Sequence, residues 1–454
     1  MKKKNVRQLA FDALLKIEYE QAYSNLSIHH TIERGWLNEK DSRLFTELVY
    51  GTVQRKLTLD YYLSHFLTRK MKKKDEWIIP LLRMALYQMV YLEKIPEHAI
   101  VFETVQIAKK KGHKGLASLV NGVLRSIQRK GLPDIDKIED DIKRLSVKYS
   151  HPEWLVSTWI RQYGLETAEK ICEMNLQRPK VTARVNIRKT NRTDLLSMLE
   201  KEGVAAEESR LSLDGIVIQE GNVVQTEAYQ KGLLTIQDES SMLVGRAVNP
   251  EKGETILDCC AAPGGKTTHL AELMNCEGTI VALDVHEHKL SLIQQQLERL
   301  QLSNVSLYAL DARQVRSKFP DESFDRILVD APCTGFGVIR RKPDIKWKKT
   351  EQDVMEMSRI QLEILEAVSP LLKKGGTLVY STCTLDKREN EQVIETFLNR
   401  HDDFVRDESL AERLPDELLP YMGDKRGEIQ ILPQYFSSDG FFIAAMRKKV
   451  GKIE

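Results

Sequence analysis

The strongest local signal in the sequence is the stretch DCCAAPGGKT at residues 258–267. An apolar run at 255–257 precedes it and a helical pattern at 266–274 follows it, so we expect a turn between a strand and a helix. Small residues at such a turn let a ligand lie against the backbone, and the first turn of a helix offers unpaired N–H groups. The stretch therefore predicts a ligand site at the edge of a sheet.

Strand-like and helix-like runs alternate on both sides of this turn. The predicted strands are 255–257, 279–283, 305–310, 326–329 and 377–380, and the predicted helices between them are 266–274, 288–300 and 352–368. This alternation indicates an α/β Rossmann-like sheet with parallel strands wrapped by helices. Residues 430–432 and 441–445 flank the turn sequence SSDG and predict a C-terminal antiparallel hairpin.

The sequence that precedes this sheet has a different pattern of apolar residues. Helical periodicity at 6–17, 77–91, 97–111 and 116–128, without strand-like alternation, predicts an all-α bundle over residues 1–140. A turn-rich acidic stretch follows, and mixed short runs predict a small α+β middle domain over 145–233. The sheet domain is then expected over 234–454, so the fold is multidomain, in agreement with the length of 454 residues.

Charge is distributed unevenly along the chain. Residues 1–150 carry 28 Lys and Arg against 18 Asp and Glu, whereas the remainder carries 40 against 48. A basic front suggests a polyanionic partner, and the lysine runs 72–74 and 109–111 are candidates for phosphate contacts, although a solvated helical surface explains the same charges. Because no run of about 18 apolar residues and no signal-peptide pattern occurs, we expect no membrane segment. The six cysteines lack metal-site spacing, so we expect no metal and a reducing, cytoplasmic location.

Three ligand classes compete for the turn. A nucleoside triphosphate loop needs glycine at position 260, where this chain has Cys260, and the dinucleotide pattern G-x-G-x-x-G is absent. S-adenosylmethionine needs no phosphate cradle, and Asp284, Asp311 and Asp330 end successive strands, where ligands bind in open sheets. We expect Asp284 at the ribose hydroxyls and Asp311 at the adenine amino group, although any one such residue can be a simple cap.

Two cysteines follow neighbouring strands of the predicted sheet. Cys333 follows the fourth strand and Cys383 the fifth, so both thiols are expected to face one pocket, although buried packing cysteines are common. Methylation of carbon 5 of a pyrimidine requires a thiolate to add to carbon 6, because carbon 5 is otherwise a poor nucleophile. Asp330 is then the candidate acid at ring nitrogen 3, and the second thiol has a role in release. Such a base must be unpaired or flipped out. The chemistry leaves open which cysteine attacks.

The motifs resemble those of the RNA 5-methylcytosine methyltransferase family. The resemblance is carried by the turn at 258–267, by DAPCTG at 330–335 and STC at 381–383, and by the shorter matches QDESS at 237–241, RKPD at 341–344, ENE at 389–391 and DGFF at 439–442. The front segments RQLA at 7–10, FTELVYG at 45–51 and VNGVLR at 120–125 are similar to those of the antitermination-factor (NusB-like) RNA-binding bundle. The whole arrangement resembles a bacterial family that methylates a cytosine of small-subunit ribosomal RNA.

The resemblance implies an enzyme that uses S-adenosylmethionine, with Cys383 as nucleophile, Cys333 assisting release and Asp330 as a third catalytic residue. It implies a cofactor site made of Cys260, Ala261, Ala262, Pro263, Gly264, Gly265, Lys266, Asp284, Asp311 and Asp330. The implied partner is 16S ribosomal RNA, and we expect a monomer. Two alternatives stay open: the same chemistry on transfer RNA, and a non-catalytic NusB-like RNA-binding or assembly factor.

Overall fold

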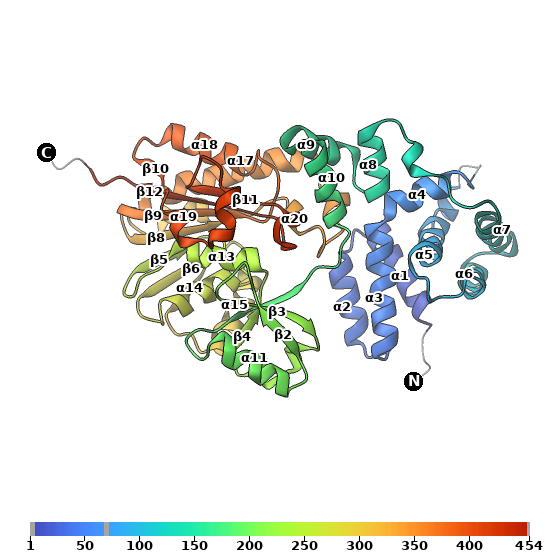
Figure 1. Ribbon diagram of the computed structural model, residues 1–454, viewed down its shortest axis with the longest axis horizontal. Coiled ribbons are helices and arrows are strands. Elements are labelled where there is room, and N and C mark those ends of the chain that lie inside the picture. The colour runs from blue at the N-terminus through green and yellow to red at the C-terminus, as the bar shows by residue number, and fades with distance from the viewer. Residues whose placement is uncertain (1–4, 68–71, 452–454) are drawn as a thin grey trace. The chain divides into compact units, whose positions relative to one another are not determined.

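The computed structural model describes residues 5–67 and 72–451 (Figure 1). The chain divides into two compact units. The helical unit comprises Met1–Leu176 and Ile339–Lys348, and the sheet unit comprises Gln177–Val338 and Lys349–Glu454. Among the described residues, no helix is long and apolar enough to span a bilayer.

The helical unit is all-α, as predicted. Its helices are α1 (Val6–Tyr19), α2 (Ser24–Glu33), α3 (Glu39–Gln54), α4 (Lys56–Ser64), α5 (Ile78–Tyr91), α6 (Glu97–Lys111), α7 (Lys114–Lys130), α8 (Asp141–Tyr149), α9 (Glu153–Tyr163) and α10 (Leu165–Met174). Phe11, Phe45 and Leu82 are fully buried in its core. The sequence pattern predicted α3 as a helix that begins at Asp41, but it missed α2 and α4. The buried residues of α2 are only Ser24 and Ile28, so this helix lacks the apolar stripe that periodicity detects.

A segment from the second half of the chain completes this unit. Residues 339–348, which include the short helix α16 (Ile345–Lys348), lie against α1 to α3. Lys346 is fully buried and donates to the backbone oxygen of Gln54 at 2.8 Å, and Trp347 donates to that of Val53 at 2.8 Å. Asp344 accepts from the backbone N–H of Ser24 at 3.1 Å. Backbone groups near the ends of α2 and α3 thus have hydrogen-bond partners more than 280 positions away in the sequence.

The small sheet of the sheet unit is antiparallel, with strand order β2-β3-β1-β4. Its strands are β1 (Val181–Val185), β2 (Ala205–Glu208), β3 (Gly215–Glu220) and β4 (Leu234–Ile236), with helices α11 (Arg192–Lys201) and α12 (Glu227–Gln230). Buried Ala183, Leu195 and Ile216 belong to its core. The predicted α+β middle domain is confirmed in its fold class.

The large sheet has the strand order β10-β12-β9-β8-β5-β6-β7. Its strands are β5 (Thr255–Asp258), β6 (Thr279–Asp284), β7 (Val305–Ala309), β8 (Phe324–Asp330), β9 (Leu372–Thr382), β10 (Phe404–Arg406), β11 (Glu428–Ile431) and β12 (Phe441–Lys448). Strands β5 to β9 pair in parallel, and β12 pairs antiparallel with β9, β10 and β11. The Rossmann-like sheet with an antiparallel hairpin is confirmed, but β12 lies inside the sheet because β10 pairs along its outer side.

Helices cover both faces of this sheet (Figure 1). One face packs on α13 (Glu239–Val248), α14 (Gly265–Leu273) and α15 (Glu287–Leu300), and the other on α17 (Glu351–Val368) and α18 (Glu391–Arg400). In the register, Asp258 pairs with Ala282 and Leu328, and Asp330 pairs with Ser381. The carboxyl ends of β5, β6, β8 and β9 therefore meet at one edge, which carries the predicted site residues.

Candidate active site

The turn at residues 258–267 connects β5 to α14 and is anchored on both neighbouring strands. The N–H of Cys259 donates to Leu328 at 2.9 Å, and that of Ala261 donates to Leu283 at 2.7 Å. Gly264 has φ 101°, where a side chain is strained, and a Cβ there would lie 3.2 Å from Ile293. Within residues 5–67 and 72–451, no side chain caps the N-terminus of α14, so the first N–H groups of this helix face the turn without a side-chain cap.

The carboxylates that end the strands gather around Cys260. Burial and the carboxylates of Asp258, Asp330, Asp284 and Asp311, in that order, raise the pKa of the Cys260 thiol well above its ordinary value. Asp258 is fully buried and accepts from the Thr267 hydroxyl at 2.7 Å, and burial raises its pKa to about 7. The structure thus brings together the four strand-end acids at the predicted ligand turn.

Asp284 and Asp311 also have local bonding partners. Asp284 accepts from the N–H of His286 at 2.9 Å. Asp311 accepts from the N–H of Arg313 at 2.9 Å and pairs with its guanidinium at 2.7 Å, which lowers the pKa of Asp311. Asp311 is therefore a cap of the kind considered from the sequence, and its carboxylate is shared with a cation.

Asp330 and Lys266 form an ion pair at the end of β8. Lys266 Nζ donates to Asp330 Oδ2 at 2.7 Å, and the Ser381 hydroxyl donates to Oδ1 at 2.8 Å. The Lys266 ammonium also lies 5.0 Å from the centre of the Phe441 ring. This pair connects the ligand turn to β8 and β9, the two strands that precede the cysteines.

The two cysteines lie side by side. Cys333 Sγ and Cys383 Sγ are 3.4 Å apart, and neither side chain is fully buried. The hydrogen bond with Cys383, burial and the nearby Glu389 carboxylate all raise the pKa of the Cys333 thiol. Two thiols at this distance can both contact the same part of a bound substrate.

A buried carboxylate that the sequence analysis did not assign joins the two cysteine loops. Glu389 accepts from the N–H of Thr334 at 2.9 Å and from its hydroxyl, and from the Thr384 hydroxyl at 3.2 Å. Gln361 donates to Glu389 at 3.1 Å and to the oxygen of Pro332 at 2.9 Å. Burial raises the pKa of Glu389 to about 7. The only sequence signal was the ENE match at 389–391, which does not specify a role.

The remaining cysteines lie apart from this pair. Cys259 is buried in the core of the large sheet, and Cys276 packs partly buried against its other face. Cys172 is fully buried in α10 of the helical unit. Cys259 and Cys276 therefore contribute to the packing of the large sheet.

Comparison with known proteins supports the same class. Successive parts of the chain match the NusB family (residues 4–129), an RsmF/B-like ferredoxin-like domain (151–225) and the 16S rRNA methyltransferases RsmB/F (246–447). A probable ribosomal RNA small subunit methyltransferase B from Bacillus subtilis (strain 168) is 52% identical, covering 99% of this chain and 100% of that protein. The ribosomal RNA small subunit methyltransferase B of Proteus mirabilis (strain HI4320) is 35% identical over 98% and 99%.

A solved structure shares the fold over nearly the full length. The crystal structure of PH0851 has a TM-score of 0.81 at 26% identity and covers 98% of this chain and 99% of its own. Fold, site and relatives together define an rRNA methyltransferase with a Rossmann-like catalytic sheet, as predicted. The chain belongs to the RsmB/F family of 16S rRNA methyltransferases.

Proposed function

We propose that this protein methylates carbon 5 of one cytosine in 16S ribosomal RNA, cytosine 967, through a covalent bond between Cys383 and carbon 6 of the base. The observation that supports this most directly is the Cys333–Cys383 pair, with sulfurs 3.4 Å apart at the edge of the sheet. Methylation of an exocyclic amine needs no thiol, whereas methylation of carbon 5 needs one for addition and benefits from a second for release.

The residues of the turn fit S-adenosylmethionine, which supplies a methyl group on a sulfonium. The uncapped N-terminus of α14 suits the carboxylate of its methionine part. Cys260, Ala261, Ala262, Pro263, Gly264, Gly265 and Lys266 give a backbone surface with small side chains beside it. Asp284 is placed for the ribose hydroxyls, and Asp311 for the adenine amino group.

In the proposed reaction, the Cys383 thiolate bonds to carbon 6 and charge develops on ring nitrogen 3. The Asp330–Lys266 pair holds the proton that nitrogen 3 needs and takes it back afterwards. Once Cys383 is bonded to carbon 6, its hydrogen bond with Cys333 is lost, and this bond is the largest cause of the raised pKa of the Cys333 thiol. After carbon 5 has received the methyl group, Cys333 in its thiolate form removes the carbon 5 proton. The bond from carbon 6 to Cys383 then breaks as the ring double bond re-forms, which releases the methylated base.

The test incubates the protein with labelled S-adenosylmethionine and unmodified 16S ribosomal RNA, with Cys383→Ala in parallel. We expect label in 5-methylcytosine at one position, absent with the variant. Label on transfer RNA alone would keep the chemistry and overturn the substrate. RNA binding without label anywhere would favour a NusB-like binding or assembly factor.

We also propose a role for each part of the chain, an oligomeric state and a location. We retain residues 1–140 as the RNA-binding part, 145–233 as the RNA-recognition part and 234–454 as the catalytic part. The protein acts as a monomer in the cytoplasm. Light scattering of the purified protein, alone and with 16S ribosomal RNA, tests the monomer.

A further inference from the structure

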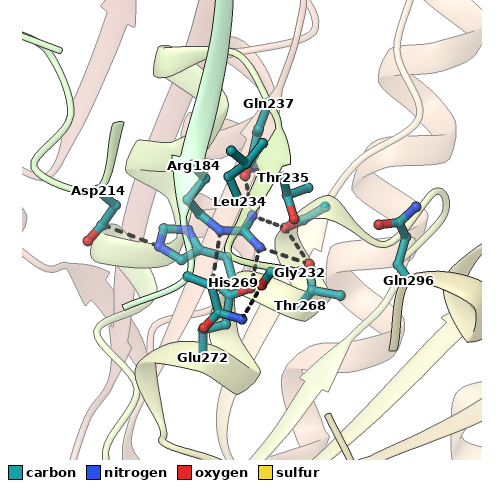
Figure 2. A network of polar contacts seen from close by, with 12 residues as sticks. Arg184, Asp214, Gly232, Leu234, Thr235, Gln237, Thr268, His269, Glu272 and Gln296 are labelled. Carbon is teal, nitrogen blue, oxygen red and sulfur yellow. Dashed lines mark hydrogen bonds and ion pairs between the residues drawn. The ribbon is translucent and has the colours of Figure 1, made fainter. Parts of the chain in front are cut away.

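A fully buried arginine connects the small sheet to the helix that begins at the ligand turn (Figure 2). Arg184 lies on β1, and all five of its N–H donors have acceptors. The acceptors are both carboxylate oxygens of Glu272 at 3.0 and 2.9 Å, the backbone oxygen of Gly265 at 2.7 Å, the Thr268 hydroxyl at 3.0 Å and the Gln237 side-chain oxygen.

Three of these acceptors share one face of α14. Gly265, Thr268 and Glu272 are spaced i, i+3 and i+7 and therefore lie in one row along the helix. His269, at i+4, lies in the same row and contacts Asp214 at 3.2 Å, again a residue of the small-sheet region. This face of α14 is polar and buried, and its residues bond to Arg184 and Asp214, which lie outside the large sheet.

Packing of the interior does not by itself require a buried ion pair such as Arg184–Glu272. A buried ion pair is often replaced by apolar residues of similar volume without loss of stability, so its particular effect is to fix geometry. Arg184 donates to the backbone oxygen of Gly265, the first residue of α14, so the bond holds the first turn of the helix against β1. The uncapped N–H groups beside it are those that suit the S-adenosylmethionine carboxylate.

We propose that Arg184 is a positioning residue for the cofactor: it holds the first turn of α14 in place from the small sheet and thereby sets the affinity for S-adenosylmethionine. The inference rests on the proposed cofactor at this turn. The small sheet is then part of the cofactor site although no residue of it needs to touch the cofactor.

The test compares the full-length protein with Arg184→Lys and with Arg184→Met/Glu272→Met, which removes the ion pair without leaving a buried charge. Arg192→Lys is the matched control, because Arg192 bonds to Ser209 and Glu208 within the small-sheet region. The dissociation constant of S-adenosylhomocysteine is measured by calorimetry, and kcat and KM by methyl transfer to 16S ribosomal RNA.

We expect the S-adenosylhomocysteine dissociation constant and the KM for S-adenosylmethionine to rise about tenfold in both Arg184 variants, as for a lost set of charge-assisted hydrogen bonds. At saturating cofactor, kcat should change less than about threefold, since the thiol pair is untouched. RNA affinity and the Arg192→Lys control should match the wild type. A purely structural role would lower the folded fraction without changing KM.

A folded Arg184 variant with wild-type cofactor affinity overturns the inference. If both Arg184 variants fail to fold, Thr268→Val removes one acceptor and leaves the ion pair, and an unchanged dissociation constant in that variant overturns the inference in the same way. Failure of the wild-type protein to bind S-adenosylhomocysteine would instead defeat the proposed cofactor and function.

Discussion

The proposed cofactor turn (residues 258–267) and the thiol pair (Cys333 and Cys383) lie at the same edge of one sheet, yet different kinds of buried carboxylate contact the elements that hold them. Glu272, behind the turn, is paired with the guanidinium of Arg184. Among the described residues, Glu389, which joins the two cysteine loops, accepts from hydroxyl, amide and backbone donors. Burial raises the pKa of the Glu389 carboxyl to about 7, and no cation lowers it again among the causes of that shift. The contacts that Glu389 makes between the two cysteine loops should therefore change near neutral pH.

The largest expected effect separates the two thiols. Cys383→Ala and Cys333→Ala should each lower methyl transfer at least about a thousandfold, because each thiol acts in a step that the other cannot replace. Only Cys333→Ala should accumulate a covalent protein–RNA adduct on a denaturing gel. An adduct that forms with Cys383→Ala and not with Cys333→Ala would reverse the proposed roles.

The next effect separates the thiol pair from the turn. Glu389→Ala removes the acceptor of the buried Thr334 N–H and one of the acceptors of the Thr334 and Thr384 hydroxyls and of Gln361, which should cost about 2 kcal/mol of stability. It should also lower kcat about a hundredfold, because the two loops lose their common acceptor, while the S-adenosylhomocysteine dissociation constant stays within about twofold. Calorimetry and single-turnover assays check both values. Glu389→Gln, which retains an acceptor, should show smaller losses.

A third prediction concerns stability against pH. The pKa of Glu389 is raised by burial from an ordinary 4.5 to about 7. Its folded form therefore binds more protons than its unfolded form, so its contribution to stability is present below pH 4.5 and is lost as pH rises through 7. The loss amounts to roughly 3 kcal/mol by the usual conversion.

Thermal unfolding at pH 5.5 and pH 8 measures this contribution. The fall in Tm between the two values should be smaller in Glu389→Gln than in the wild type, because the amide does not titrate. Glu395→Gln, on the exposed side of α18, is the control and should retain the wild-type fall. Equal falls in wild type and Glu389→Gln would contradict the titration of Glu389.

The smallest effect concerns the acids at the ends of β6 and β7, Asp284 and Asp311. Asp284→Asn should raise the dissociation constant of S-adenosylhomocysteine about tenfold, and Asp311→Asn only about threefold, because Asp311 already shares its charge with Arg313. Titration calorimetry distinguishes these values. A larger effect for Asp311 would show that its pairing with Arg313 is broken when the ligand binds.

The sequence could predict those site residues whose positions follow from the order of strands along the chain. Strand ends follow from alternation, so it could predict that Asp284 and Asp330 lie at one edge and that the cysteine loops are neighbours. Arg184 could not be found in this way, because its strand looks like any short apolar strand and periodicity carries no sign of a buried cation. Glu389 was visible only as part of a motif, since its partners Thr334 and Gln361 are distant in sequence.

The segment at 339–348 has a consequence for how the protein is made. Lys346, Trp347 and Asp344 supply bonds that Gln54, Val53 and Ser24 lack until residue 348 has been synthesised. Residues 1–176 leave the ribosome well before that, because synthesis proceeds from the N-terminus at about 5–20 residues per second. The helical unit therefore stays incomplete while about 160 residues of the sheet unit, 177–338, are translated. The strand that precedes Cys333 is finished just before the residues that complete the helical unit are made.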